Sequence, residues 1–169
     1  DAHGAPGKVE VQETVIRSCR RFTYEEVQDG VDGKPVERVT PEVKAVVLKM
    51  ATLAKMLTKV RMKRGALDFM TTEYYVKMDE QGLPLIVVKR PRLDSHRLIE
   101  EFMVAANEAV ARTLSKHKVP FMRRLHETPD PVRLQALQEE MGQLGIVAKT
   151  SLVAHPVEGL QSLLAAAVG

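Results

Sequence analysis

Residues 94–118 read DSHRLIEEFMVAANEAVARTLSKHK and form the most clearly helical stretch of the chain. Asp94 or Ser95 can cap the start of a helix here, and the basic residues at the end suit the negative pole of the helix dipole. The apolar residues at helical spacing are Leu98, Ile99, Phe102, Met103, Ala105, Ala106, Ala109, Val110 and Leu114. They make one broad face, which predicts a long helix with that face in the core.

The two adjacent glutamates of this helix have different predicted environments. Glu101 falls with Arg97 on the side opposite the apolar face, at the four-residue spacing of a solvated surface. Glu100 projects with His96 along one border of the apolar face. We therefore expect Glu101 in water and Glu100 where the core meets a cleft. Border residues of this kind usually bond to nearby backbone, and ligand binding is the alternative.

The composition bounds the class of protein. The 169 residues are 44% hydrophobic and 28% charged, which indicates one globular domain with a substantial core. The net charge is only +3, so the molecule as a whole attracts polyanions weakly. The single cysteine, Cys19, excludes an internal disulfide and favours a reducing compartment. With no apolar run of membrane-span length and no signal-peptide pattern, we expect a cytoplasmic protein without membrane contact.

The remaining segments predict a mixture of helices and strands. Further helices are expected at 23–28, 40–64, 130–144 and 156–168. Strands are expected at 8–18, 66–78, 83–89 and near 121–126, the second and third paired around a turn at 79–82. The predicted fold class is α+β, or mixed α/β, with a sheet flanked by the long amphipathic helices.

Several common catalytic motifs are absent from the sequence. It contains neither GxGxxG nor GxxxxGK[ST], and no GxSxG, HExxH or CxxC. Its aspartates are dispersed over expected loops, turns and helix ends, whereas two-metal phosphodiester chemistry needs carboxylates that converge. The sequence therefore excludes these common arrangements, and nothing in it resembles an Asp-rich metal loop.

Five runs of the sequence resemble the middle of the catalytic domain of the ribonuclease II and ribonuclease R family, the RNB domain. They are ETVIRSCRRFTYEEVQ at 13–28, RMKRGALDF at 61–69, DSHRLIEEFMVAANEAVAR at 94–112, VPFMRRLHETPDP at 119–131 and LGI at 144–146. The runs are collinear with the family over most of the chain. The resemblance implies a processive 3′ to 5′ exoribonuclease that uses Mg²⁺ and threads single-stranded RNA into a narrow channel.

The resemblance also implies RNA-binding roles for three residues. Tyr24, in TYEEV, matches a tyrosine that contacts the nucleotide at the 3′ end and helps to distinguish RNA from DNA. Glu100, the first glutamate of IEEFM, matches the glutamate that works with that tyrosine. Phe69, in GALDF, matches an aromatic on which the terminal bases stack. The structural alternatives are a capped surface tyrosine and a core phenylalanine.

The resemblance further implies what the chain lacks. The family's metal-binding aspartate cluster lies before the segment that corresponds to Asp1, and its phosphate-gripping arginine motif lies after the segment that corresponds to Gly169. We therefore expect 1–169 to be the central portion of a single RNB-like catalytic domain, supplying a 3′-end clamp and a channel wall but inactive alone. Mg²⁺ would belong to the parent enzyme, with no metal bound by this chain alone.

The expected partners are single-stranded RNA, the remainder of the RNB domain and its RNA-binding domains. Two alternatives remain open from the sequence. One is a non-catalytic relative that binds single-stranded RNA. The other is a structural or partner-binding module.

Overall fold

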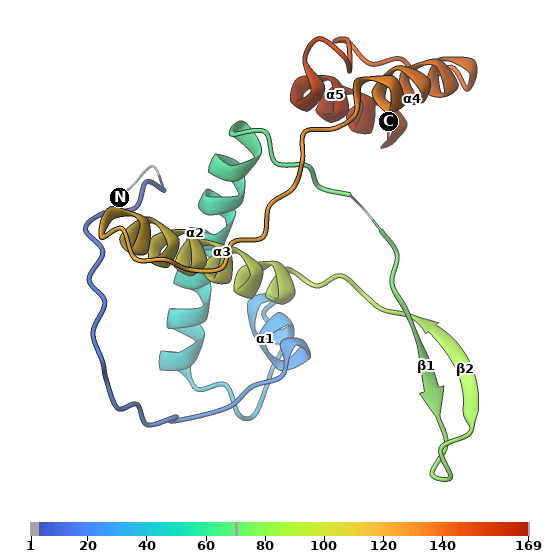
Figure 1. Ribbon diagram of the computed structural model, residues 1–169. Coiled ribbons are helices and arrows are strands. Elements are labelled where there is room, and N and C mark those ends of the chain that lie inside the picture. Colours follow the sequence, from blue (N-terminus) through green and yellow to red (C-terminus); the bar gives the residue numbers. More distant parts are fainter. Residues whose placement is uncertain (1–3, 70, 169) are drawn as a thin grey trace. The chain divides into compact units, whose positions relative to one another are not determined.

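The computed structural model describes residues 4–69 and 71–168 (Figure 1). The helices in these residues are α1 (Tyr24–Val31), α2 (Pro41–Lys63), α3 (Asp94–Lys116), α4 (Pro131–Gln143) and α5 (Pro156–Val168). The strands are β1 (Tyr74–Met78) and β2 (Pro84–Lys89), which pair as an antiparallel hairpin. Long helices combined with a small sheet confirm the expected mixed fold class. Within the described residues, none of the helices has the length and apolarity that crossing a membrane requires.

The chain divides into two compact units. Unit 1 comprises residues 1–60 and 71–121, and unit 2 comprises residues 61–70 and 122–169. Unit 1 therefore holds α1, most of α2, the hairpin and α3. Unit 2 holds the last residues of α2 together with α4 and α5.

The helix starts in both units follow from local capping chemistry. The Thr23 hydroxyl accepts a hydrogen bond from Glu26 N (3.2 Å), and the Glu26 carboxylate accepts one from Thr23 N (2.8 Å). This capping box begins α1, as the sequence predicted. Asp130 caps α4 by accepting a hydrogen bond from Val132 N (2.9 Å), with proline at the first helical position. All five expected helices are confirmed to within a few residues.

The predicted strand at 8–18 is wrong. These residues form no regular secondary structure, and Val15 and Ile16 are almost fully exposed. The alternation of apolar and polar residues is present, but a strand also needs a neighbouring strand for its backbone hydrogen bonds. In the described residues the only strand pairing is that of β1 with β2.

Two further strand predictions are corrected. The expected strand at 66–78 forms only from Tyr74, and the segment near 121–126 is irregular, with Met122 and Leu125 exposed. At the start of the first segment, the Ala66 carbonyl accepts a hydrogen bond from Gln161 Nε2 (3.0 Å) instead of a ladder bond. Residue 70 lies outside the described residues. The expected strand at 83–89 is confirmed as β2.

The hairpin is held by its ladder and its turn. Tyr74 pairs with Lys89 and Val76 with Val87, and the register shifts after Lys77. In the turn, the Asp79 carboxylate accepts hydrogen bonds from the backbone N–H groups of Gln81 (2.9 Å) and Leu83 (2.8 Å). Side chains on both faces of the hairpin are largely exposed.

The core of unit 2 is a leucine cluster between α4, α5 and the segment that joins them. Leu134, Leu152 and Leu163 are buried in it. Gly159 permits this packing, because a Cβ atom there would lie 2.8 Å from the Cα atom of Leu152. Gln161 of α5 also donates from Nε2 to the carbonyls of Met62 and Ala66 (3.0 Å each), so α5 holds the chain as it leaves α2.

Candidate functional site

Tyr24 is the first residue of α1, where the capping box fixes the backbone. Its side chain is 42% exposed, and its ring contacts the ring of His96 in the first turn of α3. The ring centroids are 4.2 Å apart and the planes are inclined by 35°. One part of the tyrosine is thus covered by the imidazole while another part reaches solvent. The sequence placed His96 on the border of the apolar face but did not predict this contact.

A second contact joins the same two helices. Gln28 Oε1 accepts a hydrogen bond from Ser95 N (3.0 Å), and Gln28 Nε2 donates to the Asp32 carboxylate (2.9 Å). Tyr24 and Gln28 are four residues apart and therefore lie on the same side of α1. That side of α1 faces the first turn of α3. The four-residue spacing was visible in the sequence, but nothing in it indicated which helix would meet that face.

Tyr24 also lines a cavity of about 400 Å³ in unit 1. Its walls are mainly apolar and include Phe22, Val27, Met50 and Ile99. The cavity lies beside the Tyr24–His96 contact. The neighbours of the tyrosine are thus the imidazole of His96 and the mainly apolar wall of the cavity. This arrangement suits an aromatic side chain with a polar tip.

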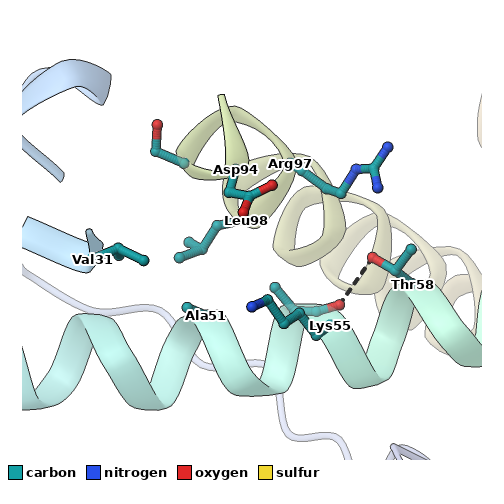
Figure 2. Close-up of a pocket in the computed structure, with 9 residues that line it drawn as sticks. Val31, Ala51, Lys55, Thr58, Asp94, Arg97 and Leu98 are labelled. Carbon is teal, nitrogen blue, oxygen red and sulfur yellow. Dashed lines mark hydrogen bonds between the residues drawn. The ribbon is translucent and has the colours of Figure 1, made fainter. Parts of the chain in front are cut away.

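Glu101 is buried, which contradicts the expectation that it lies in water. It is 2% exposed, and its carboxylate accepts a hydrogen bond from the hydroxyl of Thr58 on α2 (2.9 Å). The Thr58 hydroxyl also lies 3.0 Å from the Ala54 carbonyl oxygen, the interaction drawn as a dashed line in Figure 2. The expectation was wrong because it rested on the helical pattern of α3 alone. Thr58 on α2 supplies a hydrogen-bond donor for the Glu101 carboxylate.

A cavity of about 40 Å³ lies beside this pair, between α2 and α3. Figure 2 shows Asp94, Arg97 and Leu98 of α3 across it from Ala51, Lys55 and Thr58 of α2. Its volume is close to that of one water molecule. It is therefore a packing feature of the α2–α3 contact and too small for a nucleotide.

Glu100, by contrast, is exposed. It lies four residues after His96 and therefore on the same side of α3 as the imidazole that contacts Tyr24. By this spacing, Glu100 is expected on the side of α3 whose first turn contacts Tyr24. The helix pattern had singled out Glu100 as a border residue, and its exposure makes its carboxylate accessible to a ligand.

Phe69 belongs to unit 2. It lies in the irregular segment that follows α2 and is 54% exposed. The strand predicted over 66–78 does not form at Phe69. Its exposure also differs from that of a core phenylalanine.

Metal binding requires several ligand side chains that lie close together. Across residues 4–69 and 71–168, no group of three or more His, Cys, Asp or Glu side chains lies close enough to hold a metal ion. The carboxylates present in this part of the chain therefore do not fit a Mg²⁺ site.

The comparison with protein families decides the family. The family model of the RNB domain matches residues 1–167. The chain belongs to the RNB domain family. This confirms the resemblance seen in the sequence, and the match includes the segments that carry Tyr24, Phe69 and Glu100.

Named relatives of this RNB chain are ribonucleases. Ribonuclease R of Thermotoga maritima is 36% identical over 157 residues, which cover 92% of this chain and 22% of the relative. Ribonuclease R of Aquifex aeolicus is 35% identical over 150 residues, which cover 88% of this chain and 21% of the relative. The RNB chain thus spans about a fifth of the length of these relatives.

Solved structures give the same family. Mycoplasma genitalium RNase R in complex with ribose-methylated single-stranded RNA matches with a TM-score of 0.77 and 29% identity, over 86% of this chain and 23% of that one. The same enzyme in complex with double-stranded RNA matches with a TM-score of 0.76 and 29% identity, over 86% of this chain and 26% of that one. The fold of the RNB chain is therefore that of RNase R over the matched part.

Proposed function

We propose that this chain is part of a 3′ to 5′ exoribonuclease that processively hydrolyses single-stranded RNA, in which it binds the RNA near its 3′ end. The observation that carries the proposal is the RNB-domain match over residues 1–167. It is supported by relatives named ribonuclease R and by a solved relative in complex with single-stranded RNA.

Tyr24 and Glu100 are proposed to read the terminal nucleotide together. Tyr24 is partly exposed and held at the start of α1, and Glu100 is exposed on the side of α3 that meets it. A ribose 2′-hydroxyl can donate a hydrogen bond to a carboxylate, and deoxyribose has no such group. A tyrosine and a carboxylate on one side of a helix contact are thus suited to prefer RNA over DNA.

Phe69 is proposed to stack on a base. Its side chain is more than half exposed, so its aromatic face is available to a ligand. Stacking of this kind contributes about 1–3 kcal/mol per base and tolerates any base sequence. Such a contact would suit an enzyme that moves along RNA of any sequence.

The hydrolytic step is proposed to depend on Mg²⁺ and on residues outside this chain. On this proposal, the role of this chain's own residues is to bind and orient RNA. The proposed partners are accordingly RNA, the remainder of the RNB domain and further RNA-binding domains. On this proposal the 169-residue chain alone retains RNA without shortening it.

The first test uses the purified chain with 5′-labelled single-stranded RNA and a matched DNA at low salt with Mg²⁺. We expect RNA to be retained over DNA with no shortening. Phe69→Ala should weaken retention of both by about 5- to 150-fold, the equivalent of 1–3 kcal/mol. Glu100→Gln should instead reduce the preference for RNA. Tyr74→Ala removes an aromatic side chain of β1 that, like Phe69, is more than half exposed, and serves as the control.

Two results would contradict the proposal. Equal retention of RNA and DNA by the unsubstituted chain would remove the proposed selectivity. EDTA-sensitive shortening that survives controls for contaminating nuclease would show that this chain assembles its own metal site. Retention without shortening by a complete protein with Mg²⁺ would instead favour a non-catalytic RNA-binding relative.

A further inference from the structure

We propose that His96 and Gln28 are positioning residues, which hold Tyr24 in a fixed place relative to Glu100 and thereby sharpen the preference for RNA. The inference rests on the proposed role of Tyr24 in binding RNA. His96 and Gln28 would affect the preference for RNA over DNA through Tyr24. Neither residue would contact the RNA.

The first part of this arrangement is the contact between the rings. With centroids 4.2 Å apart and an inclination of 35°, the imidazole of His96 lies against the Tyr24 ring. Aromatic contacts of this kind contribute stability beyond simple burial. Tyr24 is the first residue of an eight-residue helix and is 42% exposed, so the imidazole is a main neighbour of the exposed ring. The imidazole therefore restricts which rotamers the tyrosine adopts.

The second part is what holds the imidazole. His96 Nδ1 accepts a hydrogen bond from Leu93 N (3.2 Å), at the position where a glutamate or glutamine completes a capping box. An Nδ1 atom that accepts a hydrogen bond carries no proton, which leaves the neutral ring with its proton on Nε2. The ring is thus tied to the backbone at the start of α3. The Tyr24 ring therefore contacts an imidazole whose Nδ1 atom is hydrogen-bonded to the backbone.

The third part is Gln28, one turn further along α1. Its Oε1 accepts a hydrogen bond from Ser95 N (3.0 Å), and its amide is oriented by the bond from Nε2 to Asp32 (2.9 Å). A single contact would let α1 turn about its own axis on α3. Two contacts on one side of α1, a turn apart, prevent that rotation.

These contacts set the distance between the two RNA-binding groups. Glu100 is carried by α3, and Tyr24 is carried by α1. A single ribose can be read by both groups only if the two helices keep one mutual orientation. Loss of either contact should therefore reduce RNA binding more than DNA binding, because only RNA offers the 2′-hydroxyl.

The experiment separates the two properties of His96 with two substitutions. His96→Gln keeps an acceptor for Leu93 N–H but removes the ring, whereas His96→Phe keeps a ring but removes the acceptor. We expect His96→Gln to lower the ratio of RNA to DNA affinity by about two- to tenfold, as the loss of a ring contact implies. We expect His96→Phe, which keeps a ring but loses the bond that holds it, to lower the Tm and to lower that ratio less than His96→Gln does. Gln28→Ala should lower the ratio as His96→Gln does.

Controls make each outcome decisive. His117→Gln changes the exposed histidine at the other end of α3 and should leave the affinity ratio unchanged. Tyr24→Ala is measured in parallel. If Tyr24→Ala leaves the ratio unchanged, the proposed function of Tyr24 fails and this inference fails with it. If Tyr24→Ala lowers the ratio but His96→Gln and Gln28→Ala do not, the proposed function stands and this inference is overturned. Equal losses of RNA and DNA binding that follow the fall in Tm would show a purely structural role and would also overturn it.

Discussion

At the scale of single residues, the adjacent glutamates of α3 show how burial is decided by a neighbour. Glu101 is buried because Thr58 of α2 donates a hydrogen bond to its carboxylate, while Glu100 is exposed one position earlier. A carboxylate removed from water needs such partners, since an unsatisfied buried group is costly. Thr58 therefore contributes more than an ordinary helix threonine.

We expect Thr58→Val to lower the free energy of unfolding by about 1–3 kcal/mol, because the buried carboxylate loses a donor while side-chain volume is nearly preserved. Thr52→Val is the matched control. Thr52 makes the same hydroxyl bond to the carbonyl four residues earlier (3.0 Å to Leu48 O) but is exposed. Its substitution should change stability by about 0.5 kcal/mol or less. Urea unfolding measures both, and equal effects would refute the special role of Thr58.

The same residues show what the sequence could and could not predict about the candidate site. Local patterns predicted the capping box that begins α1 and the border position of Glu100, whereas the RNA-binding roles of Tyr24 and Glu100 came from the family resemblance and stay predictions. The sequence assigned Glu101 to water because the helical pattern of α3 contains no information about α2. It also missed the contact between His96 and Tyr24, because a ring contact between distant segments has no periodic signature.

At the scale of elements, the connection after α2 depends on Gly65. Its φ is +98°, and a Cβ atom there would lie 2.4 Å from Val157 Cγ1 of α5. Glycine is thus required both by backbone conformation and by the close approach of α5. The same connection leads to Phe69, so its backbone geometry determines where Phe69 is placed.

Gly65→Ala should destabilise the protein by more than the ~1–3 kcal/mol of a strained backbone conformation alone. Gly33→Ala isolates that backbone cost, since Gly33 has a φ of +81° and open space around its Cα. A Val157→Ala background should reduce the excess by removing the clashing methyl group. Thermal unfolding of the two single variants and the double variant measures the difference. No excess over Gly33→Ala would contradict the close approach.

Elements were predicted with unequal success, for a physical reason. Helices are specified by local signals such as the Thr23 capping box and the Asp130 cap, and they form where expected. Strands require partners, so the alternation at 8–18 was insufficient, whereas 83–89 succeeded because its partner follows a tight turn. The hairpin also formed its first strand later than predicted, since Ala66 is bonded to Gln161.

At the scale of the whole molecule, buried leucines are distributed unevenly. Among the described residues, Leu134, Leu152 and Leu163 form the core of unit 2, whereas Ala54 and Leu98 are the buried apolar side chains of unit 1. Composition gives the total amount of apolar material and cannot predict this distribution. The stability of unit 2 therefore depends on a few large side chains.

Leu163→Ala should destabilise unit 2 by about 2–5 kcal/mol, because the cavity left in the leucine cluster is only partly filled by relaxation. Hydrogen exchange of peptides from α4 and α5 should become correspondingly faster. Leu144→Ala, at a leucine that is 69% exposed, is the control and should leave exchange nearly unchanged. Unchanged protection in α4 and α5 of the Leu163 variant would contradict the assigned core.

The hydrogen bond from Ser95 to Gln28 also joins α1 to a segment that is distant in the sequence. α1 is eight residues long, too short to persist as an isolated helix in water. It becomes stable only on docking, and that docking must close a loop of 67 residues. α2 and α3 can form their turns in about a microsecond. The Tyr24–His96 contact therefore requires a docked α1, and a partly unfolded chain in which α1 has detached would lose the proposed preference for RNA.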